Sequence, residues 1–146
     1  MNLEPKSITI EMQTIIDNDG QMEYNTLNEA GTYYEKDNRC ILTFEETSDE
    51  GAPVKNLITI NPNRVSIKRV GPVTMHQQFR TNQKTENVFQ HPHGYIHMET
   101  LTDTIAFHSL TDEQNGFLTI DYSVSLNGQE ERKHKLELTI KEEDAE

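Results

Sequence analysis

The chain is a series of short segments in which apolar and polar residues alternate, joined by turn-forming residues. A period of two is typical of half-buried β-strands, and no segment shows the period of an α-helix. Asp19-Gly20 and Asn127-Gly128 are hairpin signals, because these residue pairs tolerate positive φ. The expected strands are Ser7–Asp17, Gln21–Ala30, Gly31–Lys36, Arg39–Glu46, Val54–Ile60, Val65–Val70, Val73–Phe79, Lys84–Gln90, Tyr95–Leu110, Phe117–Leu126 and Glu131–Lys141.

This order predicts an all-β fold, an antiparallel up-and-down meander of about eight to ten strands closed into a barrel. Closure removes the two long exposed edges of such a sheet, and a two-sheet sandwich is the alternative. In the long segment Tyr95–Leu110 the apolar phase shifts after Met98, which predicts a bulge near Thr100. The length of 146 residues predicts a single domain, 1–146, with an ordered core over 6–141 and a disordered acidic tail over 142–146.

Composition excludes several classes of partner. The net charge of −12 argues against nucleic acid and against anionic membrane surfaces, since both need a basic footprint. No stretch approaches the roughly 20 apolar residues of a membrane helix, and the first residues lack the apolar region of a signal peptide. The single cysteine, Cys40, cannot form an intrachain disulfide. These features predict a cytoplasmic protein.

The segment from Gly51 to Thr85 carries six basic residues and no acidic one, against a net charge of −18 in the rest of the chain. At its centre, Gly71-Pro72 joins two expected strands. A two-residue loop there would place Lys68 opposite Met75, whereas a three-residue loop pairs Ile67 with Met75 and makes one face largely apolar. A slip of one residue turns every side chain to the other face. We therefore expect a three-residue or bulged connection.

This register leaves Arg69 and Gln77 as the polar residues of the inward face, with Arg69 close to the rim of the barrel. An arginine there can bind a carboxylate or phosphate through paired hydrogen bonds. Arg69 and Gln77 are therefore the candidate ligand-binding residues. The favoured alternative for Arg69 is an ion pair with Glu45 or Glu46 on a neighbouring strand.

Residues along most of the chain form a pattern that a known family shares. They are Val65-x-Ile67-x-Arg69-x-Gly71, Met75, Gln77, Phe79, Gly31-x-Tyr33-Tyr34, Glu45-Glu46, Thr85, Pro92-x-Gly94 and Thr100. With this pattern the chain resembles the YwiB-like β-barrel family of bacteria, over roughly Ser7 to Glu142. The resemblance implies a calycin-type, lipocalin-like barrel in a small cytoplasmic protein, and it favours the barrel over the sandwich. The family has no assigned function, so the resemblance implies no site residue, although calycin barrels often bind small hydrophobic ligands.

The sequence contains three weaker chemical signals. His91, His93 and His97 are of a type that binds zinc, but only Glu99 adds a ligand at suitable spacing, so a solvated turn is favoured and no metal is expected. Cys40 lies beside a basic residue, yet it shares its phase with apolar neighbours and is expected in the core. The hydroxyl row of Thr100, Thr102 and Thr104 could line a polar cavity, but the solvent face of a strand is favoured.

The sequence therefore favours a cytoplasmic barrel that binds a small amphipathic or anionic ligand inside the barrel. The alternative is a non-catalytic module for protein interaction or self-association, possibly a homodimer, that uses the basic 51–85 surface. An enzyme is the least favoured interpretation, because no catalytic motif occurs. No cofactor is expected.

Overall fold

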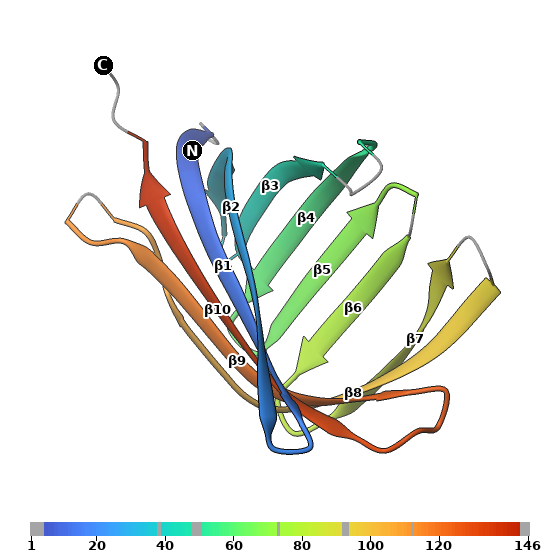
Figure 1. Ribbon diagram of the computed structural model, residues 1–146. Coiled ribbons are helices and arrows are strands. Elements are labelled where there is room, and N and C mark those ends of the chain that lie inside the picture. The colour runs from blue at the N-terminus through green and yellow to red at the C-terminus, as the bar shows by residue number, and fades with distance from the viewer. Residues whose placement is uncertain are drawn as a thin grey trace.

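The computed structural model describes residues 5–37, 39–47, 51–72, 74–91, 94–111 and 113–143, and this part of the chain consists of ten strands without a helix (Figure 1). Among the described residues, none forms a helix long and apolar enough to cross a membrane. The strands are β1 (Lys6–Asn18), β2 (Gln21–Lys36), β3 (Arg39–Thr47), β4 (Pro53–Asn61), β5 (Arg64–Val70), β6 (Met75–Arg80), β7 (Lys84–His91), β8 (Gly94–His108), β9 (Gly116–Leu126) and β10 (Arg132–Glu142).

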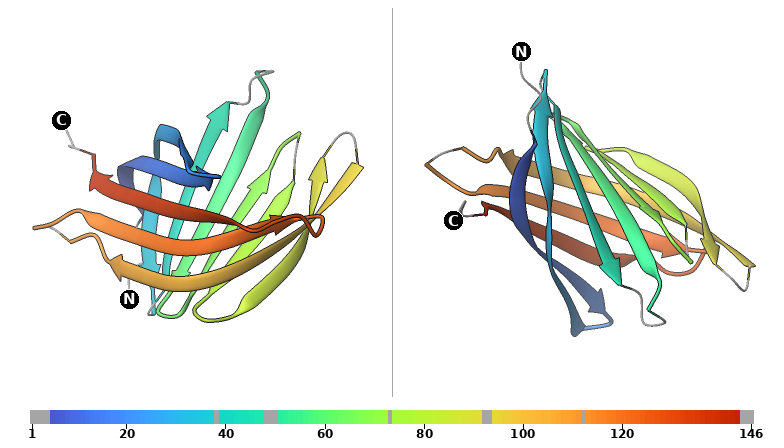
Figure 2. Two further views of the ribbon diagram at one scale, coloured as in Figure 1. Left: turned by 60° about the horizontal axis from the view of Figure 1, so that its bottom comes forward. Right: turned by 90° about the horizontal axis from the view of Figure 1, so that it is seen from above.

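All ten strands belong to one antiparallel sheet in the order β6-β5-β4-β3-β2-β1-β10-β9-β8-β7. Consecutive strands pair as hairpins, except β6 and β7, and β1 also pairs with β10, so that Ile8 lies opposite Glu142. Figure 1 accordingly shows β1 and β10 side by side. In Figure 2 the strands β8–β10 run across the direction of β3–β6, and the sheet curls round into a nearly closed barrel. The predicted all-β barrel is confirmed, and the sandwich alternative is wrong.

The barrel is only nearly closed because β6 and β7 are the two ends of the sheet. A short turn joins them, and Thr102 of β8 exchanges backbone hydrogen bonds with Asn82 and Gln83 in that turn, at 2.8 and 3.2 Å. Thr85 Oγ1 also donates to the carbonyl oxygen of Gln78 at 2.6 Å. We call the boundary between β6 and β7 the seam. Turn and side-chain hydrogen bonds hold the seam in place of a regular ladder.

Alternation along the strands builds the core, as the sequence predicts. Inward side chains from both walls of the barrel are fully buried, among them Ile10, Leu42, Phe79, Leu118 and Leu138. The rings of Phe79 and Tyr122 meet edge to face, with their centroids 4.8 Å apart. This packing fills the inside of the barrel with apolar side chains over most of its length.

Both predicted hairpin turns are present. Asp19 and Gly20 have φ of 53° and 89°, and Asn127 and Gly128 have φ of 51° and 73°. Two consecutive residues with positive φ make the tight turn whose twist matches that of the flanking strands. The Asp19-Gly20 pair sets the register of β1 with β2, in which Asn18 pairs with Gln21. After Asn127-Gly128 the ladder is offset by one residue from that of a two-residue loop, because Val124 pairs with Arg132.

The central hairpin has the predicted faces but a different register. Arg69 pairs with Met75 and Ile67 with Gln77, whereas the predicted partner of Ile67 was Met75. The connection is longer than three residues, because five residues, 70–74, separate the paired residues Arg69 and Met75. A shift of two residues keeps every side chain on its face, so Ile67 and Gln77 point inward as expected.

Strand limits and the position of one bulge also differ from the sequence prediction. β2 runs through Gly31, where the sequence suggested a break, because Gly31 pairs with Ile8 on one side and Phe44 on the other. The bulge in β8 lies between Thr102 and Thr104, a few residues beyond the predicted position. β10 includes Glu142, one residue of the predicted tail, and residues 144–146 lie outside the described part.

Candidate functional site

Arg69 lies near the end of β5 on the inward face, as predicted. Its guanidinium Nη2 donates a hydrogen bond to Glu46 Oε1 on β3, reaching across β4. The Arg69 side chain is 39% exposed and that of Glu46 is 16% exposed. The favoured expectation of a carboxylate partner is therefore confirmed for Glu46, and this pairing occupies part of the capacity of Arg69 to bind an anion. A ligand-binding role for Arg69 stays a prediction.

Gln77 is buried on the inward face of β6, and Nε2 donates a hydrogen bond to Thr100 Oγ1 at 3.0 Å. This bond crosses the seam from β6 to β8. The inward neighbours Ile67, Phe79 and Tyr122 are at most 6% exposed, so the space around Gln77 is packed. The hydrogen bond of Gln77 accordingly links β6 to β8, which is a structural role, and its role in ligand binding stays a prediction.

The row of threonines on β8 does not lie on the solvent face, and that prediction is wrong for two of its three members. Thr100 and Thr102 are 1% and 0% exposed and point into the barrel. The bulge then turns Thr104 outward, where its hydroxyl donates to Asp121 Oδ2 at 2.8 Å. Thr102 Oγ1 is buried without a hydrogen-bond partner among the described residues. The inner wall beside the seam is therefore polar, although it is closely packed.

The largest concave surface described lies on the outside of the barrel. It is a groove of about 640 Å³ across β2–β5, which we call the outer groove. Most of its lining residues are outward residues of four adjacent strands, because every second side chain of a strand points to this face, whereas Phe44 and Asn56 are buried. Its lining residues are Ala30, Thr43, Phe44, Glu45, Lys55, Asn56, Leu57, Lys68 and Val70.

The outer groove combines exposed apolar surface with two positive charges. Leu57 and Val70 are 39% and 44% exposed, and both line this groove. The sheet register places Lys55 opposite Val70, and Leu57 opposite Lys68, so apolar and basic residues alternate across β4 and β5. Among the described residues, neither lysine has an ion-pair partner, although Glu45 lies opposite Lys55 in the register.

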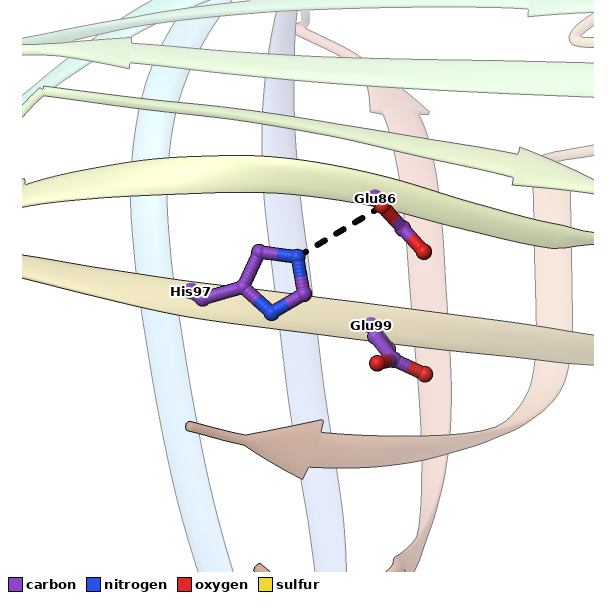
Figure 3. A group of neighbouring side chains, drawn as sticks. All are labelled: Glu86, His97 and Glu99. Atoms are coloured by element: carbon purple, nitrogen blue, oxygen red, sulfur yellow. Dashed lines mark ion pairs between the residues drawn. The ribbon is translucent and has the colours of Figure 1, made fainter. Parts of the chain in front are cut away.

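A second group of polar side chains lies on the outward face of β7 and β8, and Figure 3 shows its members pointing toward one another. His97 Nε2 lies 3.5 Å from Glu86 Oε2, and Glu99 completes the group. Each residue can offer one ligand atom, and the three atoms lie within 4.8 Å of one another. The sequence suggested only His97 and Glu99 of this group. Glu86 comes from the neighbouring strand, while His93 and the side chain of His91 lie outside the described residues.

Cys40 is buried in the core, as predicted, and is poorly suited to nucleophilic chemistry. Burial raises the pKa of its thiol, although a hydrogen bond with Tyr33 Oη at 3.4 Å acts in the opposite direction. Burial, and hydrogen bonds with Cys40 and Glu35, raise the pKa of Tyr33 as well. Thiolate, not thiol, is the reactive form of cysteine, so this arrangement keeps Cys40 inert at neutral pH.

Comparison with known proteins identifies the family. The sequence profile of the domain of unknown function DUF1934 matches residues 10–138, most of the chain. This chain belongs to the DUF1934 family. It is also 30% identical over 132 residues to the uncharacterised β-barrel protein YwiB of Bacillus subtilis (strain 168), covering 90% of this chain and 91% of that protein. The suspected resemblance to YwiB is thus confirmed.

The solved structures agree with this assignment. The DUF1934 chain described here superposes on the crystal structure of the YwiB protein from Bacillus subtilis with a TM-score of 0.84 and 27% identity. The match covers 96% of this chain and 94% of the other. The likeness therefore extends to the whole barrel.

Sequence reasoning missed the outer groove. It considered the basic 51–85 surface through its charge alone and assigned no role to the outward apolar residues Leu57 and Val70. Leu57 and Val70 carried the missing signal, since both fall in the outward phase of their strands. Recognising them as neighbours of Lys55 and Lys68 requires the register of β4 with β5, which the sequence does not show.

Proposed function

We propose that this DUF1934 protein binds a small amphipathic anion, such as a carboxylate with an apolar tail, in the outer groove. The observation that carries this proposal is one concave surface that holds exposed Leu57 and Val70 beside Lys55 and Lys68, which have no ion-pair partner in the part of the chain that the structure describes. The proposal keeps the class of ligand expected from the sequence and moves it from the inside of the barrel to its outer wall.

The size of the groove favours a small molecule. Ligand pockets usually measure about 300–1,000 Å³, and the outer groove falls in this range. A stable protein interface would need about 800 Å² on each partner. The apolar surface of the groove is confined to a few side chains, which suits a short tail better than a protein face.

The charge of the groove supports an anion. Lys55 and Lys68 lie on adjacent strands within the basic 51–85 segment, whereas the rest of the chain is strongly acidic. Contacts at an exposed lysine are worth about 0.2–1 kcal/mol each. The exposed apolar residues Leu57 and Val70 must therefore supply much of the affinity, and the lysines make the groove prefer a ligand with a negative charge. The lone buried thiol also fits a cytoplasmic location, which is part of the proposal.

The proposal can be tested with 1-anilinonaphthalene-8-sulfonate, an amphipathic anion whose fluorescence rises in apolar surroundings, and with octanoate as competitor. Replacing both lysines in Lys55→Gln/Lys68→Gln should weaken binding about 2- to 30-fold, from the value of two exposed charge contacts. Leu57→Ser should weaken it through the lost apolar contact. The matched control is Lys36→Gln/Lys135→Gln, which removes two exposed lysines elsewhere on the barrel and should leave the affinity unchanged.

Nuclear magnetic resonance can locate the probe. Octanoate should shift the methyl signals of Leu57 and Val70 on the outer face, and leave those of Ile58 and Ile67 on the inner face unchanged. Shifts centred on Ile58, Ile67 and Gln77 would instead support the ligand site inside the barrel. Absence of binding, together with a sedimenting mass that falls as salt rises, would favour self-association through the basic surface, because salt screens charge pairs.

A further inference from the structure

The side chains of Glu86, His97 and Glu99 converge on the outer face of the barrel, away from the outer groove. Glu86 lies on β7 directly opposite Glu99 on β8, and His97 lies two residues before Glu99 on the same face. Figure 3 shows the imidazole between the two strands, facing the carboxylates. We propose that these three residues bind one divalent transition-metal ion of the Zn²⁺ type.

The electrostatics of the group favour a cation. Like charges directly opposite each other on antiparallel strands destabilise a sheet. Lys84 partly relieves the pair of carboxylates, with Nζ 3.2 Å from Glu99 Oε2. His97 lies beside the other carboxylate, so the two negative charges are held together on the surface by weak contacts. A divalent ion between them would neutralise both.

The distances fit a tetrahedral metal ion. Zinc binds imidazole nitrogen and carboxylate oxygen at about 2.0–2.2 Å, which places two ligands of one tetrahedral ion about 3.3–3.5 Å apart. His97 Nε2 and Glu86 Oε2 are already 3.5 Å apart. The third ligand atom lies within 4.8 Å of both, so a small rotation of Glu99 completes the set. Calcium and magnesium prefer sites built from oxygen atoms, and the imidazole therefore selects against them.

Both backbone polar groups of His97 are hydrogen-bonded to one residue of the turn between β9 and β10. The His97 backbone N–H donates to Asn127 Oδ1 at 2.9 Å, and the Asn127 N–H donates to the His97 carbonyl oxygen at 2.7 Å. Asn127 itself is fixed by the tight turn that it forms with Gly128. This clamp orients the strand that carries His97 and Glu99, and supporting contacts of this kind raise the affinity of metal sites.

Three protein ligands leave a fourth position of a tetrahedral ion open. Metal sites with three protein ligands and a water are those that also bind exogenous anions or activate water. Glu86 and His97 are well exposed, with side-chain accessibilities of 61% and 43%, so this position faces solvent. The site is thus an open, exchangeable one, unlike a closed structural zinc site.

Isothermal titration calorimetry of the untagged full chain with ZnCl₂ tests the proposal. One ion should bind per chain, and Mg²⁺ at the same concentration should not. His97→Ala, Glu86→Gln and Glu99→Gln should each weaken binding at least tenfold, because each removes a ligand. His108→Ala, which removes an exposed histidine at the far end of β8, should leave the affinity unchanged.

One variant should act in the opposite direction. Lys84→Gln removes the ammonium group that competes with the metal for Glu99, so Zn²⁺ should bind about two- to fivefold more tightly. Circular dichroism checks that each variant is folded. Binding that His97→Ala leaves intact, equal binding of Mg²⁺, or no binding of one ion per chain would overturn the proposal.

Discussion

The substitution Gly31→Ala tests how tightly β2 packs against its neighbours. Gly31 lies inside β2 and pairs with β1 and β3 at once. A Cβ atom added there would lie 2.4 Å from the backbone oxygen of Thr43 and 3.0 Å from Phe44 Cβ. Neither atom can move away by a side-chain rotation. The sheet itself must therefore shift to accept the methyl group.

Two terms of opposite sign decide the outcome. Alanine in a strand is normally favoured over glycine by about 0.5–1 kcal/mol, because glycine loses more backbone freedom on folding. Overpacking a filled core costs about 1–3 kcal/mol, and a clash with backbone belongs at the upper end of that range. We therefore expect a net loss of about 2 kcal/mol in the free energy of unfolding. For a chain of this size that corresponds to a fall of about 4–8 °C in Tm.

Equilibrium unfolding in urea at 25 °C measures this loss. Ala30→Gly, one residue earlier with its side chain facing outward, reports the glycine term alone in the same strand and should cost about 0.5–1 kcal/mol. Adding this glycine term to the net loss measured for Gly31→Ala gives the steric cost at position 31. If Gly31→Ala is as stable as the parent chain, or more stable, the close approach of β2 and β3 is not as described.

Three further outcomes follow from the structure. His134 packs against Tyr122 with ring centroids 5.1 Å apart, and burial together with Arg132 lowers its pKa, although Glu23 opposes this. His134 therefore binds a proton more readily in the unfolded chain, so the urea midpoint of the parent chain should fall as pH drops through about 6.5 towards the lowered pKa. The fall should be smaller in His134→Gln, and equal falls in the parent chain and the variant would contradict this. Cys40 should react with 5,5′-dithiobis(2-nitrobenzoate) at least about 100-fold more slowly in the folded chain than in urea, and a fast native reaction would disprove its burial. A double-mutant cycle of Arg69→Met and Glu46→Gln should give a coupling of about 0.5–1 kcal/mol in urea unfolding, since Arg69 is partly exposed, whereas additive effects would refute the ion pair.

Local sequence patterns predicted most of the architecture because they act over a few residues. Alternation decides which side chains face the core, and Asp19-Gly20 and Asn127-Gly128 decide where two hairpins turn. Closure followed from the same pattern, since a meander with long unpaired edges is unfavourable in water. These are properties of each segment and its immediate neighbours.

Pairing between strands could not be predicted in the same way. The shift of two residues in the β5–β6 register leaves every face unchanged, so no hydrophobic pattern distinguishes it from the predicted one. Thr100 and Thr102 were misjudged because threonine suits either face of a strand. Their burial depends on the position of the bulge, which alternation alone placed a few residues too early.

The same limit explains the candidate sites. Both of them are made of residues that come together only across a strand pair: Lys68 beside Leu57 in the outer groove, and Glu86 beside Glu99 at the proposed metal site. In a single sequence, Glu86 and Glu99 are two separate acidic residues. Only the register of β7 with β8 makes them opposing charges that need a cation.

The distribution of polar groups also indicates where a function can reside in this barrel. Inside, Arg69 is bonded to Glu46 and Gln77 to Thr100, so an interior ligand would have to replace existing hydrogen bonds as well as displace packed side chains. Outside, Lys55 and Lys68 have no ion-pair partner among the described residues, and a ligand there replaces only water. A buried hydrogen-bond donor or acceptor that is left without a partner costs about 1–3 kcal/mol, whereas an exposed one can bond to water and costs little. The free-energy balance therefore favours binding on the outer wall, where the DUF1934 barrel offers both the groove and the metal ligands.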